Sequence, residues 1–352
     1  MPRLKKNGRG LAVGVVGASG MVGRELLSVL EKSRFPVGEL KVFSSGRGAK
    51  SVLFRSRRLP LSAPSLAALR GCRLAFFVSS DAVSRRWAPA LAASGVWVID
   101  DSSAFRLDAN VPLVIPEINA SVLRRDRRLV AGPNCTMSGL GLAAAALDRA
   151  AGLKDVRAAS YQAVSGAGLS ALREFLLQAR TVTGRLRAER ADLFAPALRS
   201  LRPAVLPRAI AFNAVPQVGD FAADGYSREE IKVAAELRKV LRSPRLPVSV
   251  TAVRVPTLRG HALAAWLRLK RPLSLARARA VLKKAAGVVM MAAPDYPTPA
   301  GCAGRTEAFV GRLRRGASPN EIALWVVSDN LLKGAASNSL QIAQELLRRG
   351  WL

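Results

Sequence analysis

The sequence is poor in the side chains that build metal centres, disulfide frameworks and aromatic surfaces. Its 352 residues include three cysteines, one histidine and 5% aromatic residues. Cys72, Cys135 and Cys302 match no pairing rule or zinc-binding spacing, so we expect no metal site and a reducing compartment. No apolar run is long enough to span a bilayer, which argues against a membrane protein.

The start of the chain is basic and precedes an apolar segment, as in a signal peptide. However, the apolar segment Leu11–Gly17 leads directly into a glycine turn and contains no small-residue cleavage site. It is better explained as a first strand, and we expect a cytoplasmic protein.

Acidic residues are also scarce. The chain has 24 Asp and Glu against 55 Lys and Arg, which gives a formal net charge of +31. Such an excess is typical of nucleic-acid-binding proteins. The arginines are scattered, however, and are not interleaved with aromatic residues. Anionic ligands or an arginine-biased genome explain the charge as well, so nucleic acid is not the partner that we predict.

The first half of the chain alternates short apolar strands with amphipathic helices. We expect buried strands at 11–17, 39–43, 74–79 and 96–100, with helices over 24–30 and from about residue 83. This pattern is typical of an α/β fold with a doubly wound parallel sheet. The chain is long enough for two domains of ordinary size.

The turn after the first strand carries Gly17, Gly20 and Gly23 in a GxxGxxG spacing. Between a strand and a helix, such glycines let backbone N–H groups approach a pyrophosphate at the helix N-terminus. The alternative is a helix start that merely needs small residues.

The second strand ends at Ser44-Ser45-Gly46-Arg47, without the acidic residue that binds the ribose of NAD. Hydroxyl groups and an arginine suit a 2′-phosphate, which favours NADP. An ordinary polar turn has the same composition.

Cys135 lies where a strand leads into a helix. Residues 128–131 are expected to end a buried strand, Pro133 and Asn134 form a turn, and residues 139–151 are almost all Gly, Leu and Ala, as in a buried helix. A helix N-terminus lowers the pKa of a thiol and favours the thiolate. A small buried cysteine without a chemical role is the alternative.

The second half has longer elements, which predict an antiparallel or mixed sheet. We expect strands at 156–165, 248–255, 262–269 and 324–328, and helices at 169–181 and 330–347. A further helix begins at Ser227, because Ser227 and Glu230 have the spacing of a capping box. On that helix Glu229 and Lys232 lie side by side.

His261 is the only imidazole in the chain, so any histidine acid–base step must use it. It follows Gly260 in a predicted turn. A cysteine nucleophile, a histidine and a nicotinamide site together indicate oxidation or reduction of an acyl group through a thioester. Arg254, Lys232 and Arg106 would bind anionic groups of the substrate, although Arg106 could equally be a solvated surface residue.

The chain resembles the aspartate-β-semialdehyde dehydrogenases from about Val13 to about Leu347. The resemblance is carried by the segments GVVGASGMVG, VIDDSSAFR, VPLVIPEIN, GPNCT, YQAVSGAG, FNAVPQVGDF, YSREEIK, VRVPTLRGH and SDNLLKGAASNS. It implies an NADP-binding Rossmann domain formed by residues 1–134 and 329–352, with the last helix packing back on it. It also implies a glyceraldehyde-3-phosphate-dehydrogenase-like α+β catalytic and dimerisation domain over 135–328, and a homodimer or a tetramer of dimers.

The resemblance implies a role for each matching residue. Cys135 is similar to the family's nucleophile, His261 to its acid–base group and Gln162 to the residue that orients the substrate. Arg254 corresponds to the ligand of the substrate carboxylate and Glu229 to that of the amino group. The implied phosphate site consists of Arg106, Asn134 and Lys232, with Ser103 in support. The implied cofactor site consists of Gly17, Ser19, Gly20, Met21, Val22, Gly23, Ser44, Ser45, Arg47, Ser165, Gly166 and Asn330.

The implied reaction is the reversible conversion of 4-phospho-L-aspartate and NADPH to L-aspartate 4-semialdehyde, phosphate and NADP⁺, for lysine, threonine and methionine synthesis. Two alternatives are a related acyl-phosphate reductase, such as an N-acetyl-γ-glutamyl-phosphate reductase, and a catalytically silent paralogue. Gln162 and the Glu229–Lys232 pair favour the aspartyl substrate. The chain departs from the family at Gly132, where Asn is usual, and at Ala262-Leu263, where Ser-Glu is common.

Overall fold

The computed structural model describes residues 10–45, 49–184 and 190–352. The chain divides into two compact units. One is formed by Met1–Pro116, Ala120–Gly132 and Ala336–Leu352, and the other by Glu117–Asn119 and Pro133–Ala335. Each unit has its own sheet.

The first unit is built on a five-stranded parallel sheet in the order β2-β1-β5-β6-β7. Its strands are β1 (Leu11–Val16), β2 (Val37–Phe43), β5 (Leu74–Phe77), β6 (Trp97–Asp100) and β7 (Leu129–Ala131). A hairpin of β3 (Ser51–Phe54) and β4 (Arg57–Pro60) lies outside this sheet. All four residues of β5 and of β6 are buried, as the apolar runs predict.

Helices connect these strands and cover the sheet. They are α1 (Met21–Lys32), α2 (Leu66–Arg70), α3 (Asp81–Ala93) and α11 (Ser337–Arg348). The segment between β6 and β7 contains α4 (Pro116–Asn119), of which Glu117–Asn119 belong to the second unit, and a 3₁₀ turn (Ala120–Val122). Helix α1 contacts α11, and α2 contacts α3. The chain runs from β1 to β2 on one side and reaches β5 on the other, so the strand order reverses beside β1. In open α/β sheets, ligands bind at such a reversal, beyond the carboxyl ends of the strands.

The C-terminal segment packs on the first unit. Helix α11 contacts α1 and β6. The Trp351 ring stacks on that of Trp97 with 5.7 Å between centroids, and the Trp351 carbonyl accepts a hydrogen bond of 3.1 Å from the Trp97 indole. Helix α11 begins at Ser337, not at residue 330 as predicted, because Leu332–Ala336 forms a π-helical turn.

The second unit is built on a mixed six-stranded sheet in the order β11-β12-β13-β10-β8-β9, with parallel pairs only at its two edges. Its strands are β8 (Leu153–Gln162), β9 (Val248–Arg254), β10 (His261–Leu269), β11 (Val288–Met290), β12 (Ala308–Arg315) and β13 (Glu321–Ser328). The prediction of an antiparallel or mixed sheet is confirmed. Strand β8 ends at Gln162, earlier than predicted, because Val164–Ala167 forms a 3₁₀ turn.

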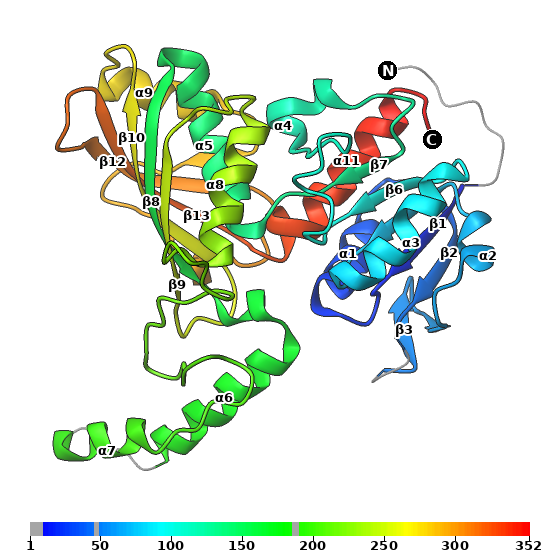
Figure 1. Ribbon diagram of the computed structural model, residues 1–352, viewed down its shortest axis with the longest axis horizontal. Helices are drawn as coiled ribbons and strands as arrows, with labels where there is room; N and C mark the ends of the chain where they lie inside the picture. The colour runs from blue at the N-terminus through cyan, green and yellow to red at the C-terminus, as the bar shows by residue number, and fades with distance from the viewer. Residues whose placement is uncertain (1–9, 46–48, 185–189) are drawn as a thin grey trace. The chain divides into compact units, whose positions relative to one another are not determined.

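Three helices pack on this sheet: α5 (Cys135–Ala151), α8 (Arg228–Val240) and α9 (Leu275–Lys284). Helix α5 lies centrally, in contact with β10, β13 and both other helices (Figure 1). Nearly every residue of α5 is buried, which explains its Gly, Leu and Ala composition. Helix α10 (Pro299–Cys302) contacts β13.

Helices α6 (Leu169–Thr183) and α7 (Phe194–Arg199), with a 3₁₀ turn at Ala191–Leu193, form an arm that projects away from the six-stranded sheet (Figure 1). The arm has a small apolar core that includes Phe175, Val182 and Ile210. It also carries exposed apolar side chains, among them Leu177 at 67% and Phe212 at 54% exposed. Over the residues that the structure describes, no helix is both long and apolar enough to cross a membrane.

Candidate active site

Cys135 is the first residue of α5 and is partly exposed. Asn134 caps the helix, since its Oδ1 accepts hydrogen bonds from the backbone N–H groups of Thr136 (2.7 Å) and Met137 (3.2 Å). The predicted strand–turn–helix placement of the cysteine is confirmed. The helix dipole at this end favours negative charge on the sulfur.

His261 faces the sulfur of Cys135. Its Nε2 lies 3.4 Å from Cys135 Sγ, and its Nδ1 accepts a hydrogen bond of 3.0 Å from the N–H of Ala163. A neutral imidazole that accepts at Nδ1 carries its proton on Nε2. His261 therefore presents an N–H to the sulfur.

The prediction that His261 lies in a turn is wrong. It is the first residue of β10 and is completely buried, because β10 pairs with β13 from its first residue onward. Burial and the nearby charge of Arg254 lower the pKa of His261 to about 3. The orientation of the ring comes from the Ala163 backbone, so it does not require polar side chains at Ala262 and Leu263.

Arg254 is the last residue of β9 and is 6% exposed. Its Nη1 donates a hydrogen bond of 2.8 Å to the carbonyl of Ala163. Burial lowers the pKa of Arg254, opposed by the charges of Cys135 and Glu229. Gly166 packs against both side chains: a Cβ there would lie 2.9 Å from Arg254 Nη1 and 3.1 Å from His261 Nε2.

The carboxylate of Glu229 on α8 is hydrogen-bonded to three further side chains. It accepts hydrogen bonds from Asn134 Nδ2 (3.1 Å), Thr136 Oγ1 (3.2 Å) and Gln162 Nε2 (3.2 Å). Lys232 lies one turn further along α8 and is half-buried. The predicted capping box at Ser227 and Glu230, which begins this helix, is confirmed.

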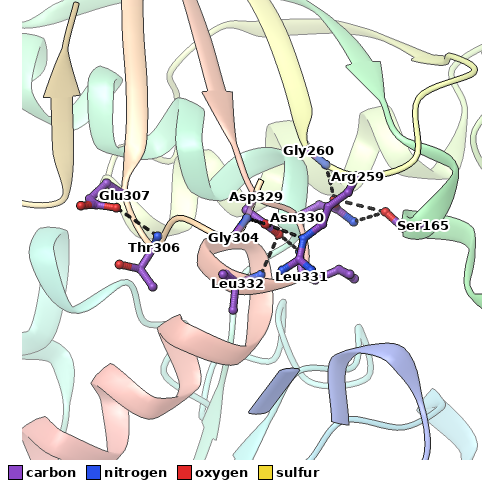
Figure 2. Close-up of polar contacts among 10 residues, drawn as sticks. All are labelled: Ser165, Arg259, Gly260, Gly304, Thr306, Glu307, Asp329, Asn330, Leu331 and Leu332. Carbon is purple, nitrogen blue, oxygen red and sulfur yellow. Dashed lines mark hydrogen bonds and ion pairs between the residues drawn. The ribbon is translucent and has the colours of Figure 1, made fainter. Parts of the chain in front are cut away.

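The residues of the second unit thus come together from five elements: α5, α8, β8, β9 and β10. The structure brings together Asn134, Cys135, Gln162, Glu229, Arg254 and His261, at the starts of α5, α8 and β10 and at the ends of β8 and β9. Ser165 and Asn330 also meet, since Asn330 Nδ2 donates to Ser165 Oγ at 3.0 Å (Figure 2). Within the described ranges, no His, Cys, Asp and Glu side chains are grouped as a metal site.

Two residues that contact Asn134 or Glu229 were not predicted from the sequence. Thr136 donates to Glu229, and the fully buried Glu236 accepts a hydrogen bond of 2.6 Å from the backbone N–H of Asn134. Glu236 lies seven residues after Glu229 and thus on the same face of α8. The seven-residue spacing from Glu229 was the sequence signal that could have placed Glu236 near this site.

In the first unit, the glycine turn has the geometry of a nucleotide-binding loop. Gly17 has a φ of +92°, and a Cβ at Gly23 would overlap the Gly17 carbonyl oxygen. Gly20 is the N-cap of α1, and among the described residues no side chain caps this helix end. Backbone N–H groups at an uncapped helix start fit a pyrophosphate.

The remaining predicted site residues of the first unit differ in their contacts and exposure. Ser103 Oγ donates to Asp81 at 2.6 Å, and Ser44 is buried while Ser45 is exposed. Arg106 is 9% exposed and donates to the carbonyls of Gly132 (2.9 Å) and Asp101 (2.6 Å). The alternative of a solvated surface arginine is therefore wrong. Arg47 lies outside the described residues.

Gly132, where the family usually has Asn, is explained by its neighbour. A Cβ at position 132 would overlap Asp101 Oδ1, which accepts a hydrogen bond of 2.6 Å from Ser339. The carboxylate of Asp101 thus occupies the space that a larger residue at this position needs.

Comparison with known proteins identifies the family. Residues 12–125 match the model "Semialdehyde dehydrogenase, NAD binding domain", and residues 144–333 match "Semialdehyde dehydrogenase, dimerisation domain". The aspartate-semialdehyde dehydrogenase of Aquifex aeolicus is 38% identical over 350 residues, covering 97% of this chain and 99% of that protein. The Bacillus subtilis protein of the same name is 38% identical over 345 residues, covering 96% and 98%. The chain belongs to the aspartate-semialdehyde dehydrogenase family.

Comparison with solved structures leads to the same family. A crystal structure of aspartate semialdehyde dehydrogenase II from Vibrio cholerae has a TM-score of 0.90 at 32% identity, covering 97% of this chain and 99% of that one. Membership in the aspartate-semialdehyde dehydrogenase family confirms the resemblance, the two-part fold class and the prediction of an oxidoreductase. The match to a dimerisation domain supports a homodimer.

Proposed function

We propose that this protein catalyses the reversible reductive dephosphorylation of 4-phospho-L-aspartate to L-aspartate 4-semialdehyde, in lysine, threonine and methionine synthesis. The observation that carries the proposal is the Cys135–His261 pair at the start of α5. Cys135 Sγ lies 3.4 Å from His261 Nε2, and the buried Arg254 lies beside them. This is a nucleophile with a hydrogen-bond donor and a cation for an anionic substrate.

Cys135 is proposed to attack the acyl-phosphate carbonyl as a thiolate. The new S–C bond replaces the C–O bond to phosphate, which leaves. The thioester would take up hydride from a bound nicotinamide at its carbonyl carbon, and Cys135 would then leave as thiolate to give the aldehyde. The helix dipole stabilises the anionic sulfur at the first and last stages.

His261 is proposed to act through its Nε2–H. With Nδ1 bonded to the Ala163 N–H, the ring donates to the sulfur or to an oxyanion on the carbon attached to it. Because burial and Arg254 lower its pKa to about 3, the ring stays neutral at working pH, and the single proton of the neutral ring, on Nε2, makes this hydrogen bond.

The remaining roles follow from charge and position. Arg254 is proposed to bind the substrate carboxylate and Glu229 the amino group, with Gln162 orienting the acyl carbon. Asn134, Lys232 and Arg106 are proposed as phosphate ligands, with Ser103 supporting them. The Glu229 carboxylate, which accepts hydrogen bonds from Asn134 and Gln162, would pair with an ammonium group.

We further propose that the cofactor is NADP. The open N-terminus of α1 at Gly20 fits the pyrophosphate, and Ser44, Ser45 and Arg47 provide groups for a 2′-phosphate. The ratio of kcat/KM for NADP⁺ and NAD⁺ tests this choice, and a preference for NAD⁺ would overturn it. A cytoplasmic location, supported by the free thiols of Cys72 and Cys302, and a dimer as the smallest assembly complete the proposal.

The decisive experiment measures reduced nicotinamide formed from L-aspartate semialdehyde, phosphate and NADP⁺. We expect activity that requires phosphate and disappears in Cys135→Ala but persists in the control Cys302→Ala, a buried cysteine. Activity only with N-acetyl-L-glutamate semialdehyde would favour the related reductase. A folded protein without either activity would favour the silent paralogue.

A further inference from the structure

Asp329 is a buried carboxylate to which the proposed function gives no role. It directly follows β13 and is 0% exposed, and both of its carboxylate oxygens accept hydrogen bonds (Figure 2). Its Oδ2 accepts hydrogen bonds from Arg259 Nε (2.5 Å) and the Gly304 N–H (2.7 Å). Its Oδ1 accepts from the N–H groups of Leu331 (2.9 Å) and Leu332 (3.2 Å). Four donors around one carboxylate fix its position closely.

On one side, Asp329 holds the turn that contacts the nucleophile. Its carboxylate caps the start of the π-helical turn Leu332–Ala336, and its carbonyl accepts a hydrogen bond of 3.0 Å from the Gly334 N–H. A Cβ at Gly334 would lie 2.6 Å from Cys135 Cβ and 2.9 Å from Cys135 Cα. The backbone of the turn therefore packs directly on the cysteine. Single π-helical turns of this kind are frequent at functional sites.

On the other side, Asp329 and its neighbour hold the segment that leads to His261. The ion pair with Arg259 fixes the second residue before the histidine. The Oδ1 of Asn330 accepts a hydrogen bond of 2.8 Å from the Gly260 N–H, which fixes the residue directly before it (Figure 2). One dipeptide thus contacts the supports of both members of the Cys135–His261 pair.

We infer that Asp329 is a positioning residue that sets the separation and alignment of Cys135 Sγ and His261 Nε2. It acts through the π-helical turn and through Arg259, and does not touch the substrate. The inference rests on the proposed function for its consequence in turnover, because the pair must be aligned for thioester chemistry.

The test uses Asp329→Asn, which keeps the shape of the side chain but turns an amide N–H towards the donors at Arg259 and Gly304. We expect kcat to fall by about tenfold or more, with the KM for the semialdehyde changed less than about threefold. The rate at which iodoacetamide alkylates Cys135, read by mass spectrometry of its peptide, should fall in parallel, and its pH profile should shift. Asp148→Asn is the matched control, since this carboxylate lies at the far end of α5 and accepts only from the Leu153 N–H at 2.7 Å among the contacts described.

Gly334→Ala provides an independent variant that leaves the ion pair intact and displaces the turn from Cys135. We expect the same loss of kcat and of alkylation rate. Wild-type values in Gly334→Ala, or in a folded Asp329→Asn, would overturn the inference. If the wild-type protein is alkylated at Cys135 but has no dehydrogenase activity, the proposed function fails. The alkylation rates then still decide the role of Asp329.

Discussion

The contact of Gly166 with Arg254 and His261 predicts a large effect of adding one methyl group. Gly166 lies in the 3₁₀ turn Val164–Ala167, and in Gly166→Ala the new Cβ would lie 2.9 Å from Arg254 Nη1. Neither neighbour is free to move, because Arg254 donates to the Ala163 carbonyl and His261 accepts from the Ala163 N–H. Both side chains are also buried.

The size of the expected loss of kcat follows from the overlap between the new Cβ and Arg254 Nη1. Carbon and nitrogen atoms in contact lie about 3.5 Å apart, so the groups must separate by about 0.6 Å. A displacement of about 1 Å at a reacting centre costs about a hundredfold in rate, and about half of it costs about tenfold. We therefore expect Gly166→Ala to lower kcat about tenfold. The KM for the semialdehyde should also rise, because Arg254 is the proposed carboxylate ligand.

The assay is steady-state oxidation of L-aspartate semialdehyde with phosphate and NADP⁺, at varied semialdehyde. Gly71→Ala is the control, because a Cβ there would meet only the Nζ of Lys41, at 3.2 Å. A folded Gly166→Ala protein with kcat and KM both within twofold of wild type would refute the reasoning. The packing of Gly166 on Arg254 and His261 would then not limit the reaction.

Three further predictions concern stability and assembly. Because the pKa of His261 is about 3 in the folded protein and about 6.5 when unfolded, protonation of the unfolded chain lowers stability on acidification. From pH 7 to pH 5 the wild type should lose about 2 kcal/mol more than His261→Gln in urea unfolding, and equal losses would contradict this. Lys333 is fully buried with its Nζ 2.8 Å from both oxygens of Glu117, so Lys333→Met should cost about 3–5 kcal/mol. Adding Glu117→Gln should restore part of that loss in the same assay, whereas a loss below about 1 kcal/mol would show the ion pair to be unimportant. Leu177→Asp, on the exposed arm of the dimerisation domain, should weaken the dimer in sedimentation at varied concentration, while the equally exposed control Leu53→Asp should not. Unchanged association of the arm variant would place the interface elsewhere.

Features fixed by neighbouring residues were predictable from the sequence. The glycine turn before α1, the cysteine at the start of α5 and the capping box at Ser227 each depend on a few adjacent residues. Burial of β5 and β6 followed from their continuous apolar runs. These signals were enough to predict the strand and helix on either side of the glycine turn and the place of Cys135 at a helix start.

Features that depend on distant contacts were not predictable. The apolar pattern runs without interruption from Leu331 into α11, yet the chain forms a π-helical turn first, because Asp329 and Cys135 constrain Gly334. His261 was expected in a turn, since Gly260 marks one locally, but pairing with β13 makes it a strand residue. In both cases a partner far away in the sequence decides the local conformation.

The orientations of His261 and Arg254 depend partly on the main chain of Ala163, and not on its side chain. Ala163 fixes the imidazole with its N–H and the guanidinium with its C=O. Both groups belong to the main chain, so replacing the methyl group with a hydrogen atom leaves them in place, while proline at this position removes the N–H altogether. For enzyme engineering, this means that the orientations of His261 and Arg254 can be kept while other side chains of the site are changed. Glu229, the proposed ligand of the amino group, can be replaced to accept another acyl group while the Ala163 backbone continues to hold the histidine and the arginine.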